Sequence, residues 1–148
     1  MPDILNLSPV DTREQRTVLE CLQIWLKTLD ITADLPITIA NLDLKVDGIS
    51  IVPQRGVRKF KQYACGGYQV YFPFTLYYRS TAESTDDVID GYNLIDKIGE
   101  LTQSVDLDAL LVGDMNADSF SQETTTVLVS RTGAVGTYMA NFVLIYSV

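Results

Sequence analysis

Histidine is absent from the 148 residues of this chain. The residue that most often performs general acid–base catalysis near neutral pH, and that most often binds metals, is therefore missing. Catalytic sites built on Ser-His-Asp or Cys-His groups are excluded. Only two cysteines occur, Cys21 and Cys65, so one chain cannot form a four-cysteine zinc site. The pair could form one disulfide, which alone says little about the redox compartment.

Long hydrophobic segments are also missing. No uninterrupted apolar run approaches the roughly 20 residues of a membrane-spanning helix. The first residues, 1–6, lack the basic region and apolar core of a secretory signal peptide. We therefore expect a soluble protein, made in a reducing cytoplasm, with no membrane partner.

Positive charge is scarce. The chain has 11 Lys and Arg against 19 Asp and Glu, which gives a formal net charge of −8. This charge disfavours a general nucleic-acid binder. The apolar fraction of 47% and the charged fraction of 20% are typical of a globular protein. At this length we expect a single domain, residues 1–148, that buries its own core.

Two segments have the periodicity of amphipathic helices. The first is expected to begin at a Ser8 cap and to end near Leu29 or Asp30, and the second to begin at a Ser84 cap and to end by about Gln103. Apolar residues at helical spacing define the buried stripe of each. These are Val18, Leu22, Trp25 and Leu29 in the first, and Val88, Tyr92, Ile95 and Ile98 in the second.

The remaining apolar residues alternate, which is typical of strands. Short strands are expected at 37–39, 42–44 and 49–51, one over 57–63, a long one over 68–79, and two more over 124–130 and 138–148. Pro73 predicts that the long strand lies at an edge or carries a bulge. The last strand is apolar on both faces, so we expect it at the centre, covered on both sides. The fold class is therefore α+β, with two main helices on a mainly antiparallel sheet.

No residue pattern indicates catalysis. The glycines at 66–67 and 133–136 lack the lysine of a phosphate-binding loop and predict hairpin turns. The acids of the second helix lie opposite its apolar stripe, so they indicate a solvated face, with a subunit contact as the alternative. We expect no enzyme, no cofactor and no metal site.

The distribution of charge is less ordinary. Four of the eleven cations lie within residues 55–61, whereas residues 83–108 hold eight acids against one lysine, a net charge of −7. Separated patches of opposite sign allow copies of one protein to meet head to tail. The alternative is an exposed hairpin that charge keeps soluble. The candidate subunit-interface residues are Arg55, Arg58, Lys59, Lys61, Asp86, Asp87 and Asp90.

Several segments occur in an order that resembles a phage structural family. They are Gly48–Pro53, the basic hairpin that contains residues 55–61, Gly66-Gly67, the aromatic strand ending at Arg79, the acidic helix start at 86–92 and the closing strand at 138–142. Together they resemble the minor capsid or tail-completion proteins of long-tailed phages and prophages, and their element order is similar to that of tail terminators.

The resemblance implies a tail terminator-like fold and a virion structural protein, assembled in the cytoplasm of the bacterial host. It implies a homohexameric ring that caps the tail tube at the head–tail junction, with tail-tube and neck proteins as partners. DNA would be contacted only in passing through the ring lumen. A different class of function, a small soluble peptide- or ligand-binding module without catalysis, would use the tyrosine-rich strand face of Tyr71 and Tyr77.

Overall fold

Residues 9–40 and 47–148 are described in the computed structural model of the chain. The expected Ser8 cap and the alternation at 42–44 lie outside these residues. The described residues form one mixed sheet of seven strands with three helices. The strands are β1 (Ile37–Ile39), β2 (Gly48–Pro53), β3 (Arg58–Gln62), β4 (Tyr68–Thr81), β5 (Asn116–Gln122), β6 (Val127–Thr132) and β7 (Val135–Ser147).

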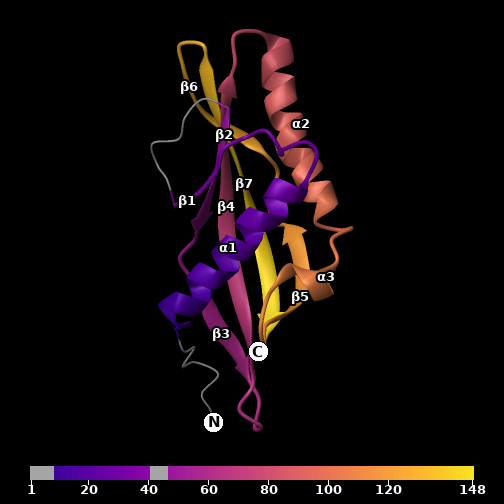
Figure 1. The fold of residues 1–148 in the computed structure, drawn as a ribbon. Coiled ribbons are helices and arrows are strands. Elements are labelled where there is room, and N and C mark those ends of the chain that lie inside the picture. Colours follow the sequence, from indigo (N-terminus) through magenta and orange to yellow (C-terminus); the bar gives the residue numbers. More distant parts are fainter. Residues whose placement is uncertain (1–8, 41–46) are drawn as a thin grey trace.

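The two long strands, β4 and β7, form the centre of the sheet (Figure 1). They pair antiparallel along their whole length, from Gln69 opposite Ser147 to Thr81 opposite Val135. Along its outer edge β4 pairs first with β3 and then with β2, and β7 pairs with β6 and then with β5. The mainly antiparallel sheet is confirmed, but β1 runs parallel to β2, which the sequence did not predict.

The expectation that Pro73 marks an edge or a bulge is wrong, because β4 is an interior strand. Pro73 lies opposite Val143 of β7, and its carbonyl accepts a hydrogen bond from the Gln54 backbone on the other side. The proline nitrogen faces that same side, at the junction where β3 has ended and β2 begins. Its missing N–H therefore interrupts neither ladder.

The helices are α1 (Thr12–Thr28), α2 (Thr85–Leu101) and the short α3 (Leu107–Leu110). Helix α1 begins after Asp11, whose carboxylate accepts a hydrogen bond from the Arg13 backbone, so Asp11 and not Ser8 is the cap. Helix α2 begins after Ser84 as predicted. Both long helices pack on one face of the sheet (Figure 1).

That face holds the core. Phe142 is fully buried, and its ring stacks on Phe74 with the centroids 5.6 Å apart. Trp25 of α1 is only partly buried and contacts Phe120 edge-on at the border of the core. Gly91 of α2 lies directly against the ring of Tyr138.

The opposite face of β7 carries Met139, Val143 and Ile145. Among the described residues, no helix packs on this face, so the expected cover on both sides is found on one side only. Met139 and Ile145 are accordingly half-buried, although Val143 is only 8% exposed. The strand is central, as predicted.

The close approach of α2 to β7 gives the first prediction. A methyl group on Gly91 would overlap the rigid Tyr138 ring, so Gly91→Ala should lower the free energy of unfolding by about 1–3 kcal/mol, the usual cost of overpacking. At Gly99 the methyl would meet the flexible amide of Gln122, which can rotate away. Gly99→Ala is therefore the matched control, expected within about 1 kcal/mol of wild type because alanine also favours the helix. Urea unfolding measures both, and equal losses would contradict the packing.

Candidate interaction surfaces

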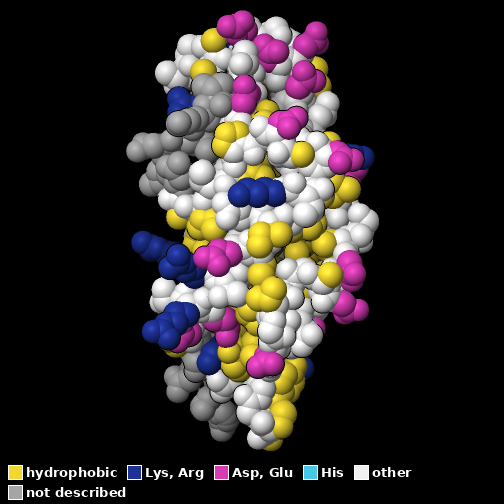
Figure 2. Space-filling model, in the orientation of Figure 1, with side chains coloured by type: hydrophobic (Ala, Val, Ile, Leu, Met, Phe, Trp, Pro, Cys, Tyr) yellow, Lys and Arg dark blue, Asp and Glu magenta, His cyan; other side chains and the backbone are white. Residues whose placement is uncertain are grey.

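The beginning of α2 forms one charged surface, which we call the acidic end and define by Glu83, Asp86 and Asp90. All three side chains are exposed. Figure 2 shows acidic side chains gathered at the end of the molecule where α2 begins. None of these three carboxylates pairs with a cation among the described residues.

Asp87, predicted to belong with these acids, also has a role within its own chain. Its carboxylate accepts hydrogen bonds from the backbone N–H of Glu83 at 3.1 Å and of Ser84 at 3.2 Å. The Ser84 hydroxyl in turn accepts from the Asp87 backbone, which completes a capping box. The Ser-x-x-Asp spacing was the sequence signal for this. Asp87 therefore stabilises the start of α2 through the carboxylate oxygen that accepts both hydrogen bonds.

The predicted cations form a second charged surface, the basic edge, defined by Arg55, Arg58, Lys59 and Lys61. It lies on and just before β3, which pairs with residues 68–71 of β4. Helix α2 follows the other end of β4, about ten residues further along an extended strand, so roughly 30 Å separates the two surfaces. The acidic end and the basic edge thus lie at opposite ends of the molecule and do not neutralise each other within one chain.

Three of these cations also contact tyrosines of their own chain, Lys61 least closely, with its ammonium 5.7 Å from the centre of the Tyr63 ring. The Arg58 guanidinium lies 4.5 Å from the centre of the Tyr71 ring, and the Lys59 ammonium lies 4.1 Å from the centre of the Tyr68 ring. Such cation–π contacts hold β3 on β4. Arg55 and Lys61 are exposed. These two side chains are therefore the better candidates for contacts with another molecule.

A partly buried hydrogen-bond network lies behind Lys59. The Tyr68 and Tyr146 hydroxyls donate hydrogen bonds to the two oxygens of Glu14, at 2.5 and 2.7 Å. The network ties the start of α1 to the end of β4 that pairs with β3 and to the adjoining end of β7. The hydrogen bond to Glu14, together with burial, raises the pKa of Tyr68 to about 12. Burial first, and then Glu14, raises the pKa of Tyr146 above its usual range.

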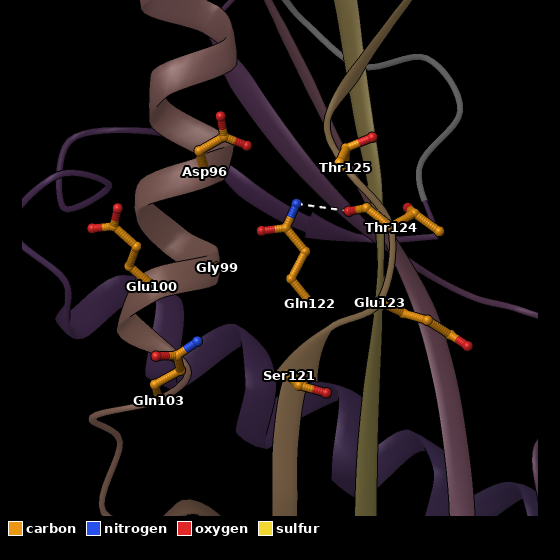
Figure 3. A pocket seen from close by; sticks show the side chains of 9 residues that line it. All are labelled: Asp96, Gly99, Glu100, Gln103, Ser121, Gln122, Glu123, Thr124 and Thr125. Carbon is orange, nitrogen blue, oxygen red and sulfur yellow. Dashed lines mark hydrogen bonds between the residues drawn. The ribbon is translucent and has the colours of Figure 1, made fainter.

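A polar groove of about 510 Å³ opens between α2 and the chain that follows β5 (Figure 3). Gln122 points across it toward Gly99, and its amide donates to the Thr124 carbonyl at 2.7 Å. The lining also includes the carboxylates of Asp96, Glu100 and Glu123. Nothing in the sequence predicted the groove, because its two walls come from distant segments. No cluster of metal-ligating side chains occurs among the described residues.

The other residues considered from the sequence lie apart from this groove. Tyr71 and Tyr77 are half-buried on the face of β4 without helices, Tyr71 beneath Arg58 and Tyr77 between Ser50 and Met139. Both cysteines are free: Cys65 is exposed in the turn between β3 and β4, and Cys21 is buried. Burial raises the pKa of the Cys21 thiol.

The chain matches no protein-family model and no curated protein. In the part of the chain that the structure describes, no helix is both long and apolar enough to cross a membrane.

The Glu14 network predicts a loss of stability in alkali. The Tyr68 phenol ionises near pH 10 in the unfolded chain but only near pH 12 in the folded protein. The protonated Tyr68 phenol therefore makes its full contribution to the stability of the folded protein below pH 10, and this contribution falls as the pH rises toward 12. Glu14→Gln should move this ionisation back toward pH 10, as followed by the ultraviolet absorbance of phenolate. Glu20→Gln, an exposed acid of the same helix, should leave the titration unchanged, and identical curves for the two variants would contradict the assignment.

Proposed function

We propose that this protein is a structural component of a phage virion, of the tail terminator or tail-completion kind. In this proposal it assembles into a homohexameric ring at the head–tail junction, where tail-tube and neck proteins are its partners. The observation that carries the proposal is the separation of the acidic end from the basic edge along the two central strands.

Self-association follows from this separation. A chain that carries complementary charges at its two ends can bind a second copy end to end, through two different surfaces. Such a heterologous contact repeats from copy to copy and closes into a ring when the rotation allows. Both surfaces are rigidly placed, because capping fixes the start of α2 and cation–π contacts hold β3 on β4.

The order of segments supports the phage assignment in particular. The basic hairpin, the long aromatic strand, the acid-capped helix and the long closing strand follow one another as β3, β4, α2 and β7. This is the order in which the sequence resembles tail-completion proteins. The fold observed, helices on one face of a mixed sheet, is compatible with the resemblance but also occurs in many other proteins.

DNA is the less favoured partner of the basic edge. Each copy carries a net charge of −8, and a ring multiplies this charge around its lumen, where it repels phosphate. Pairing between subunits instead cancels charge that would oppose assembly. The basic edge is therefore assigned to the neighbouring subunit, and DNA is in contact only where it passes through the lumen.

Charge reversal tests the proposal. Lys61→Glu should weaken self-association roughly fivefold, which corresponds to about 1 kcal/mol for one exposed ion pair. Lys27→Glu, at an exposed position on α1, changes the net charge equally and should have little effect. Adding Asp90→Lys to Lys61→Glu should restore part of the affinity. Sedimentation velocity over a concentration series measures the dissociation constant of each variant.

Two outcomes would contradict the proposal. One is a wild-type protein that stays monomeric at high concentration, which would favour a binding module. The other is a Lys61→Glu variant that keeps its oligomer but loses retention on DNA, which would place the basic edge against DNA in the lumen.

A further inference from the structure

An isoleucine stands exposed within the acidic end. Ile89 is 49% exposed, three residues after Asp86 and directly before Asp90. Asp86, three residues before Ile89 and four before Asp90, therefore neighbours both of them on the surface of α2. The core stripe of the helix is filled without it, because Ile95 and Ile98 are fully buried against the sheet. Folding of one chain therefore leaves about half of Ile89 exposed to solvent.

The basic edge has a matching feature. Phe60 is 38% exposed and lies between Lys59 and Lys61, where the pairing of β3 with β4 shifts register. A shift of this kind is a β-bulge, which together with flanking lysines discourages another strand from adding to the edge. A partner would therefore reach this edge through side chains rather than by backbone pairing.

We propose that Ile89 of one copy packs against Phe60 of the next copy in the ring. Asp86 and Asp90 then lie around this contact on one side, and Lys61 lies beside it on the other. This contact rests on the self-association proposed above and names the residues that hold it. An apolar centre within a charged rim is the usual anatomy of a protein interface.

A second copy of this chain is the occupant that fits both surfaces. DNA would be repelled by the acidic end. An unrelated basic protein would complement the charge of the acidic end but not that of the basic edge. The chain itself supplies both an exposed aromatic residue next to lysines and an exposed aliphatic residue next to aspartates. The two surfaces also lie at opposite ends of the molecule, so they meet between copies and not within one.

The two apolar side chains are expected to contribute more to affinity than the charges around them. Exposed ion pairs are weak, whereas a desolvated apolar contact at the centre of an interface is often a hot spot. Truncating either residue should therefore weaken association roughly tenfold, a larger change than any single charge reversal.

A double-mutant cycle tests the contact. Sedimentation velocity gives the dissociation constants of wild type, Ile89→Ala, Phe60→Ala and the double variant. We expect each single change to weaken association about tenfold, and the double variant to be little weaker than the weaker single variant. Ile24→Ala, at a 63% exposed position on α1, is the matched control and should associate as wild type does. Circular dichroism checks that each variant is folded.

The other outcomes separate the two proposals. An oligomeric wild type whose affinity neither truncation changes would overturn this contact and leave the ring standing. Independent, additive losses would show that Ile89 and Phe60 do not touch each other, which also overturns the contact. A monomeric wild type would overturn the ring itself, and the contact with it.

Discussion

The pairing of β4 with β7 fixes the position of every surface discussed above. Both strands are long enough for each to accept two short strands in succession along its outer edge. Their continuous ladder forms the centre of the sheet face on which α1 and α2 pack, where Phe74 stacks on Phe142. Because one end of β4 carries β3 and the other leads into α2, the ladder also sets the distance between the basic edge and the acidic end.

Much of this framework could be predicted from the sequence, because it depends on local periodicity. Alternating apolar residues indicated both long strands, and the stripes through Leu22 and Ile95 indicated both long helices. Strand β5 was missed, since its register shift at Asp118 places Ala117 and Phe120 three residues apart and hides the alternation. The position of β4 was predicted wrongly from Pro73. The general rule places proline at sheet edges or bulges, whereas here it lies between the part of β4 that pairs with β3 and the part that pairs with β2.

The surfaces could be predicted only in part. Clusters of charge are visible in the sequence, so the basic edge and the acidic end were both expected. Which members are engaged within the chain depends on tertiary contacts that no local pattern encodes. Asp87 caps its own helix, and Arg58 and Lys59 lie over tyrosines of β4. The hydrogen bond between Tyr146 and Glu14 joins residues 132 positions apart, beyond the reach of any periodicity.

The central claim is that copies of this chain meet end to end and close into a ring. Negative-stain electron microscopy of the purified protein, at concentrations where it is oligomeric, tests this most directly. The account predicts closed rings of uniform size, with six subunits around a central channel. Open filaments would show that the end-to-end contact does not close, and compact two-fold dimers would show that the two charged surfaces do not meet. Either result would contradict the ring.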